Sequence, residues 1–124
     1  MNAILLMGKI NALNSSIAEI TPTLNKSADT TFTINANETH IVTGTPTALN
    51  VTLAAPAADK DSMYGLMFKA GASFALTDTA PTGYSIVWCD EPTWTEGTVY
   101  EIIYRYLHID GIISAKFAEV EVSA

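Results

Sequence analysis

The chain has 124 residues, of which 48% are hydrophobic, and thirteen acidic and six basic side chains give it a net charge of −7. That length fits one domain of ordinary size. The negative charge disfavours binding to nucleic acid or to an anionic membrane, because those surfaces attract clustered cations. The single cysteine, Cys89, has no partner for an internal disulfide, a pattern that favours folding in a reducing cytosol.

Apolar residues near the N-terminus recur at alternating spacings of three and four. They are Ala3, Leu6, Ile10, Leu13, Ile17 and Ile20. This is a heptad pattern, and the residues around it are mostly polar or small, so that the apolar stripe is narrow. An isolated helix of this length is marginal in water, and we therefore predict a self-associating coiled-coil stem over residues 1–22. The alternative is an amphipathic helix that folds back on its own domain, although such a helix usually has a broader apolar stripe.

Other interpretations of the same segment are less satisfactory. A secretory signal would need a basic region before its apolar run and a longer run than Ala3–Met7, which Lys9 follows closely. No stretch of the sequence has the length of a membrane span. The heptads leave the number of helices open, because the middle heptads have an Ile/Leu pairing that favours dimers, whereas Ile17 and Ile20 favour higher order.

Pro22 ends the predicted helix, since proline lacks the amide N–H and restricts the residue before it. Residues 23–30 are interpreted as a hinge. Residues 31–124 alternate short runs of threonine, β-branched and aromatic residues with turn formers, which is typical of an all-β domain. The predicted strands are 31–36, 38–43, 49–53, 63–70, 73–77, 84–88, 99–108 and 112–122. About eight strands at spacings near ten residues predict a mainly β fold, an antiparallel β-sandwich head of the jelly-roll type after the short helix.

The strand predicted at 99–108 is apolar on both faces, which is typical of a central strand or of a strand at a subunit interface. Asp110-Gly111 follows it and is the strongest turn signal in the chain. This dipeptide predicts a two-residue hairpin loop leading into the last strand.

Residues with catalytic potential are scattered along the sequence. His40 and His108 lie in different predicted strands, with no metal-ligand spacing around either. Cys89 precedes Asp90 and Glu91, an acidic neighbourhood that makes a poor nucleophile. The sequence has no phosphate-binding glycine loop, nucleophile elbow or dinucleotide motif. We therefore predict that the protein is not an enzyme and has no catalytic residues, no metal site and no cofactor.

One segment resembles a known family. Residues 81–118 contain, in order, an aromatic strand with Tyr84 and Trp88, a loop of the form Pro92-x-Trp94-x-x-Gly97, a Tyr-Glu-Ile strand that begins at Tyr100, and a closing hairpin. This order resembles a C-terminal β module of phage virion proteins, including fibre and capsid-appendage subunits. Such modules usually sit on trimeric stems and either decorate the particle or touch a host surface. The resemblance implies a homotrimeric virion subunit that is synthesised in the host cytoplasm and attached to other virion proteins through its N-terminal end.

The aromatic residues of this segment leave a second function open. In a receptor- or carbohydrate-binding module, Tyr84, Trp88 and Trp94 would stack on sugars of a host-surface glycan. Packing is the competing role: Trp88 shares its strand face with Tyr84 and Ile86, which favours a core position. Trp94, in a loop, would either stack on a ligand or plug the edge of the sandwich.

Overall fold

The computed structural model describes residues 23–57 and 59–121, and this part of the chain is mainly β. Its strands are β1 (Thr23–Ser27), β2 (Thr31–Ile34), β3 (Glu38–Val42), β4 (Ala48–Leu53), β5 (Met63–Lys69), β6 (Ala75–Thr79), β7 (Ser85–Trp88), β8 (Val99–Tyr106) and β9 (Ile112–Val120). The eight predicted strands are all present, with ends that differ from the predictions by at most two residues. The described residues form no helix, and thus none long and apolar enough to cross a membrane.

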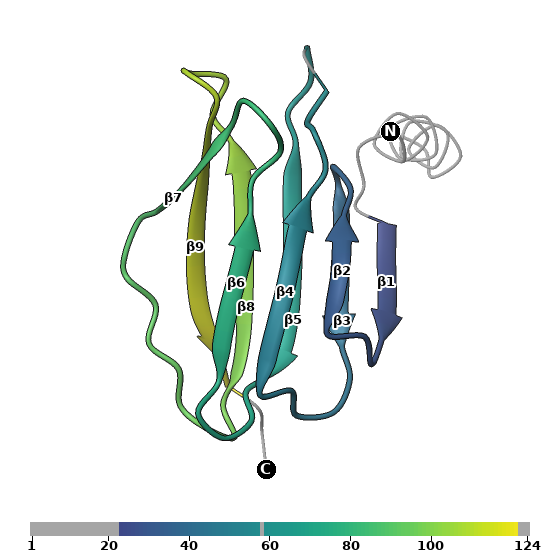
Figure 1. The fold of residues 1–124 in the computed structure, drawn as a ribbon, viewed down its shortest axis with the longest axis vertical. Coiled ribbons are helices and arrows are strands. Elements are labelled where there is room, and N and C mark those ends of the chain that lie inside the picture. Colours follow the sequence, from purple (N-terminus) through teal and green to yellow (C-terminus); the bar gives the residue numbers. More distant parts are fainter. Residues whose placement is uncertain (1–22, 58, 122–124) are drawn as a thin grey trace, which may run out of the picture.

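The strands form two sheets that face each other across a hydrophobic core (Figure 1). The large sheet has the order β1-β3-β5-β8-β9-β7, and the small sheet has the order β2-β4-β6. From β1 to β6 the chain alternates between the sheets, so that consecutive strands lie in opposite layers. The first four of these strands, β1 to β4, each pair in parallel with the strand two places later in the chain.

The expected antiparallel jelly-roll arrangement is therefore wrong. A hairpin would return the chain beside the strand it has just left, which gives antiparallel pairing. The connections between β1 and β6 instead carry the chain across to the other sheet, and the next strand of the first sheet then runs in the original direction. Within the described residues five strand pairs are parallel, and only β5–β8 and β8–β9 are antiparallel.

The expected hinge at 23–30 also needs correction, because it contains β1. This strand pairs in parallel with β3 at the edge of the large sheet, and Thr43 N donates a hydrogen bond to Ser27 O at 2.8 Å. An edge strand has few side chains to bury, and the sequence Thr-Leu-Asn-Lys-Ser accordingly carries little apolar alternation. The predicted stem, residues 1–22, lies outside the described residues.

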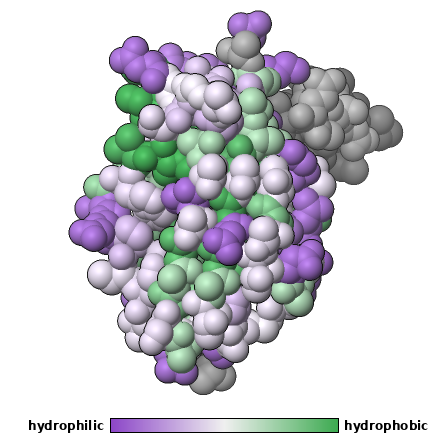
Figure 2. Space-filling model, in the orientation of Figure 1, coloured by the Kyte–Doolittle hydropathy of each residue, from purple (hydrophilic) through white to green (hydrophobic). Residues whose placement is uncertain are grey.

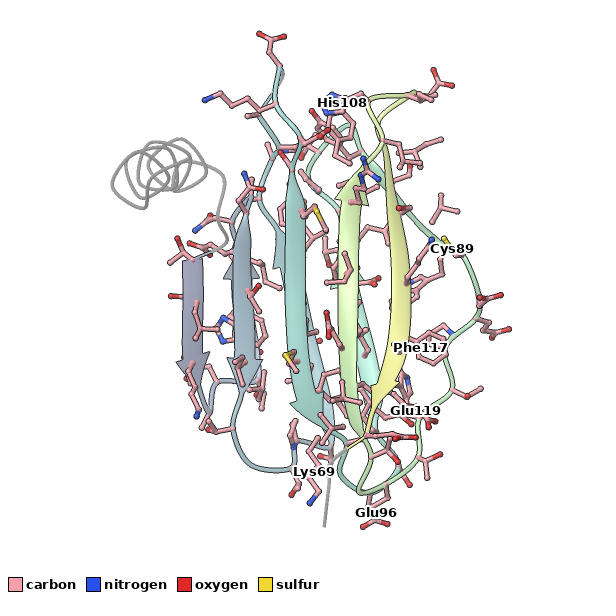
Figure 3. All side chains as sticks on the ribbon, turned by 180° about the vertical axis from the view of Figure 1, so that it is seen from behind. Lys69, Cys89, Glu96, His108, Phe117 and Glu119 are labelled. Carbon is pink, nitrogen blue, oxygen red and sulfur yellow. The ribbon has the colours of Figure 1, made fainter. Side chains whose placement is uncertain are left out.

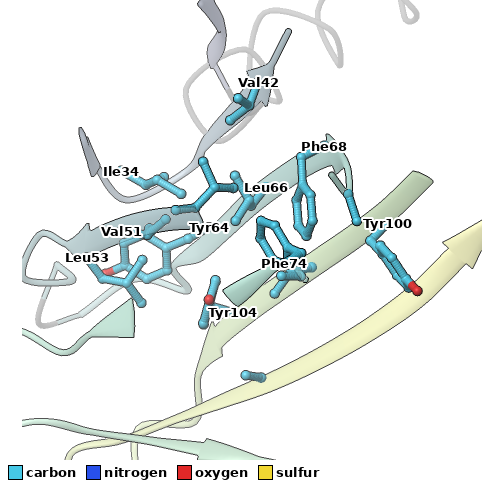
Figure 4. Close-up of a cluster of buried hydrophobic side chains, with 14 of the residues drawn as sticks. Ile34, Val42, Val51, Leu53, Tyr64, Leu66, Phe68, Phe74, Tyr100 and Tyr104 are labelled. Carbon is cyan, nitrogen blue, oxygen red and sulfur yellow. The ribbon is translucent and has the colours of Figure 1, made fainter. Parts of the chain in front are cut away.

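The core lies between the inner faces of the two sheets (Figure 4). Its most buried large side chains are Ile34, Leu49, Val51, Leu53, Tyr64, Leu66, Phe68, Tyr100, Ile102, Tyr104 and Ile113, each at most 2% exposed. β4 shows the alternation clearly, because every second residue is buried and those between are exposed. Burying one such side chain contributes about 1.5–3 kcal/mol.

The C-terminal hairpin matches its sequence signals in part: the turn lies at Asp110-Gly111, but the loop between β8 and β9 spans residues 107–111 and is longer than the predicted two residues. β8 lies inside the large sheet between β5 and β9, as the apolar residues on both of its faces predicted. Asp110 (φ 49) and Gly111 (φ 68) form the two central residues of the turn, and Ile112 N donates to Ile109 O at 2.9 Å. Two positive φ angles in succession are typical of a hairpin turn whose twist matches that of the strands.

Candidate functional site

Aromatic rings from four segments surround Trp94, which lies in the loop between β7 and β8. Its ring centroid is 5.0–5.7 Å from those of Tyr100, Phe74, Phe117 and Phe68. Thr95 N also donates a hydrogen bond to Tyr100 Oη at 2.6 Å, which holds the loop against β8. Trp94 is half-buried, and these contacts give it a packing role at the edge of the core.

Trp88 belongs to a hydrogen-bonded group that joins the two sheets. Trp88 Nε1 and Tyr104 Oη both donate to Asp78 Oδ2, each at 3.0 Å. Asp78 is on β6 of the small sheet, whereas its two donors are on β7 and β8 of the large one. Burial and the adjacent carboxylate raise the pKa of Tyr104 far above its usual value, so its hydroxyl remains a donor at all physiological pH values. We call Asp78, Trp88 and Tyr104 the inter-sheet triad.

Tyr84 lies apart from the two tryptophans. Its ring is 5.4 Å from that of Tyr106, and the Tyr106 ring is 4.3 Å from His108. Trp88 and Trp94 share Phe117 as a neighbour, at 6.3 and 5.6 Å. Among the described residues no ring contact joins Tyr84 to either tryptophan, so the three predicted stacking residues belong to two separate groups.

The predicted oligomerisation seam lies outside the part of the chain that the structure describes. Its residues are Ala3, Leu6, Ile10, Leu13, Ile17 and Ile20.

The histidines and the cysteine are widely separated. His40 is buried, its ring stacked 3.7 Å from that of Phe32 and its Nε2 3.0 Å from Ser27 Oγ. His108 is at the exposed hairpin, with Nε2 3.4 Å from Asp61 Oδ1. Cys89 is exposed. Within residues 23–57 and 59–121, no three histidine, cysteine or carboxylate side chains are grouped so as to hold a metal ion.

One side of the large sheet is not covered by the other described residues, and we call it the outer sheet face (Figure 3). Strand register places on it every second residue, those between the buried ones. Its apolar members include Leu24, Ile41, Met63, Met67, Val87 and Ile103, all half-buried or exposed. Its basic members are Lys26, Lys69, Arg105 and Lys116, all exposed. These residues were not predicted as a site from the sequence. Each basic residue nevertheless alternates with inward-facing residues along its strand, which is a signal of an outward position.

The small sheet presents a different outer surface. Its exposed strand residues are uncharged, namely Thr31, Thr33, Ala48, Asn50, Thr52, Ala75, Thr77 and Thr79. Figure 2 shows this side, where strongly hydrophobic residues gather mainly at the upper left, beside β7 and β9. The two sides of the molecule thus differ in both charge and apolar content.

No protein-family model, curated protein or solved structure matches this chain. Its function has to follow from the arrangement of its residues. The two tryptophans predicted to bind a ligand make packing contacts, whereas the outer sheet face combines uncovered apolar and charged side chains. The outer sheet face is therefore the candidate functional surface.

Proposed function

We propose that this protein is a structural subunit of a phage particle, a homotrimeric fibre or decoration protein attached to other virion proteins through its N-terminal region. The observation that carries the proposal is the apolar content of the outer sheet face. Leu24, Met63 and Val87 are 62%, 42% and 50% exposed in the single chain. Association between copies would remove such side chains from water, which is favourable for apolar surface.

The segment that resembles phage virion modules supports the same proposal. Residues 81–118 contain β7, β8 and most of β9, which are neighbours at one side of the large sheet. The Pro-x-Trp-x-x-Gly loop brings Trp94 to the core edge, where it contacts Tyr100 of the Tyr-Glu-Ile strand. The residues that carry the resemblance thus build one continuous part of the fold.

The proposal includes no enzymatic activity. His40 stacks on Phe32 and lies within hydrogen-bonding distance of Ser27 inside the fold. His108 contacts Asp61 in the exposed hairpin that follows β8. A nucleophile needs an adjacent base and a group that orients that base. These side chains are instead distributed as packing and surface residues.

Recognition of a host-surface glycan is the alternative function, and the group around Tyr84 favours it. Tyr84 and Tyr106 are half-buried, and their contact extends to the exposed His108. The accessible parts of such aromatic rings can stack on the apolar faces of sugar rings. The packing contacts of Trp88 and Trp94 favour the structural role for both tryptophans, so the alternative depends mainly on Tyr84.

The trimer is tested by the mass of the purified chain. Light scattering at micromolar concentration should give about three times the 13.3 kDa of one chain. Ile10→Asp with Ile17→Asp places charges in the predicted seam, where an unpaired buried charge costs several kcal/mol, and should reduce the mass towards that of one chain. Asn11→Asp with Ser15→Asp, outside the seam positions, is the matched control and should remain trimeric.

The virion assignment is tested on particles. Mass spectrometry of purified particles should identify the chain as a component present in many copies. A wild-type chain that is monomeric at micromolar concentration, or purified particles that lack it, would contradict the proposal.

A further inference from the structure

The outer sheet face carries four of the six basic side chains of a chain whose net charge is −7. They are Lys26 on β1, Lys69 on β5, Arg105 on β8 and Lys116 on β9. On the described strands the one acidic residue of this face is Glu101. Among the residues that the structure describes, none of the four cations has a carboxylate oxygen within 4.0 Å. The described part of this face is thus net positive, and its cations form no ion pair with the described carboxylates.

Apolar residues lie directly beside these cations across the strands. Lys26 is opposite Ile41, and Arg105 is opposite Met63. Lys116 is opposite Ile103. Lysines on a sheet commonly protect an exposed edge against aggregation, which accounts for Lys26 on edge strand β1. It does not account for Arg105 and Lys116, which lie on interior strands beside apolar neighbours, in the pattern of a mixed docking surface.

A complementary surface is present on the same chain. Asp90, Glu91 and Glu96 are exposed in the loop that joins β7 to β8, and residues 89–98 include no basic side chain. Glu119 and Glu121, at the end of β9, are also exposed. Figure 3 shows Cys89, Glu96 and Glu119 on the β9 side of the large sheet, away from β1. We call these five carboxylates the acidic edge.

We propose that the outer sheet face of one copy docks against the acidic edge of the next copy, so that the trimer closes as a ring of identical face-to-edge contacts. The inference rests on the proposed homotrimer and adds the surfaces that build it. Each contact would place the cations of one copy against the carboxylates of the next and cover the apolar residues between the cations.

The charge of the outer sheet face also favours this face-to-edge arrangement over a two-fold dimer. In a two-fold contact centred on the outer sheet face this patch meets itself, which would bring four cations against four cations. Like charges facing each other across an interface are costly. A contact between two different surfaces avoids this and closes into a ring when the rotation between copies permits. Nucleic acid is a poorer occupant, because the net charge of −7 repels phosphates and apolar side chains separate the cations.

Charge reversal and its rescue test the contact in the full-length chain. The face variant is Arg105→Glu with Lys116→Glu, and the edge variant is Glu91→Lys with Glu96→Lys. A third chain combines all four substitutions. The control, Lys60→Glu with Thr77→Glu, changes charge at exposed positions off both surfaces. Light scattering over a range of protein and NaCl concentrations measures trimer dissociation, and circular dichroism verifies the fold.

We expect the face variant and the edge variant each to dissociate at a protein concentration at least about tenfold higher than wild type. The combined variant should recover, and the control should match wild type. Added NaCl should weaken the wild-type trimer, because salt screens exposed charges. A trimer unaffected by the reversals, or not recovered in the combined variant, overturns this inference and leaves the proposed homotrimer intact. A monomeric wild-type chain overturns both.

Discussion

Neighbouring residues of the same strand build the two faces of the large sheet, and these faces differ in what covers them. On β8, Ile102 points inward and is fully buried under the small sheet, whereas Ile103 points outward and is half-buried in the single chain. In sequence both faces of β8 include apolar residues, although Glu101 and Arg105 share the outer face with Ile103. Apolar residues on two faces therefore predict a central strand, without showing whether its outer face is covered.

The largest expected effect separates these two isoleucines. Ile102→Ala leaves a cavity in the core and should lower the free energy of unfolding by about 2–5 kcal/mol, whatever the protein concentration. Ile103→Ala removes the same atoms from the outer sheet face. Its effect on unfolding should be smaller and should depend on protein concentration, because the proposed trimer would cover this residue only on association.

Urea unfolding of both variants at two protein concentrations makes this comparison. If the two substitutions lowered the free energy of unfolding equally at both concentrations, the result would contradict the claim that the small sheet covers Ile102 whereas another copy of the chain covers Ile103.

The inter-sheet triad provides a second test, with a smaller expected effect. Its hydrogen bonds join the small sheet to the inner face of the large sheet. Asp78→Ala leaves the Trp88 N–H and the Tyr104 hydroxyl without their acceptor, which should cost about 1–3 kcal/mol. Asp59→Ala, at an exposed acidic residue in the loop before β5, is the control and should change stability by less than about 0.5 kcal/mol. Urea unfolding followed by tryptophan fluorescence measures both.

A double-mutant cycle sharpens the same prediction. Tyr104→Phe should cost less in the Asp78→Ala background than in the wild type, since the hydroxyl has already lost its partner. Additive costs would show that the two side chains do not interact.

Strand positions could be predicted from the sequence because they depend on local alternation. β4 is the clearest case, with Leu49, Val51 and Leu53 buried and the intervening residues exposed. Strand pairing depends instead on where each turn sends the chain. The turn at Asn35–Glu38 closes tightly, with Glu38 N donating to Asn35 O at 3.1 Å, yet it leads to the opposite sheet rather than back beside β2. Turn formers in a sequence do not distinguish these two outcomes.

The candidate site was only partly predictable for related reasons. The strand predicted at 73–77 stops one residue before Asp78, so the sequence did not place that carboxylate on the inner face of β6, where it accepts two hydrogen bonds. Arg105 and Lys116 each alternate with buried neighbours, which predicts an exposed position. Their presence on one surface follows only from the pairing of β8 with β9.

The smallest expected effect concerns His40, the buried polar residue beside edge strand β1. Burial lowers the pKa of His40 below its usual value of 6.5, and the nearby Asp29 and Glu38 carboxylates offset this only in part. The unfolded chain therefore binds a proton at a higher pH than the folded chain does. The contribution of His40 to stability is fully present above pH 6.5 and decreases as the pH falls below that value.

Unfolding free energies measured from about pH 7.5 to pH 5 should show this decrease in the wild type. His40→Gln should reduce the pH dependence, since glutamine does not titrate, although it also loses the stacking contact with Phe32. An unchanged slope in His40→Gln would show that this histidine is protonated as readily inside the fold as outside it, and that the β1 side of the inner face is open to water.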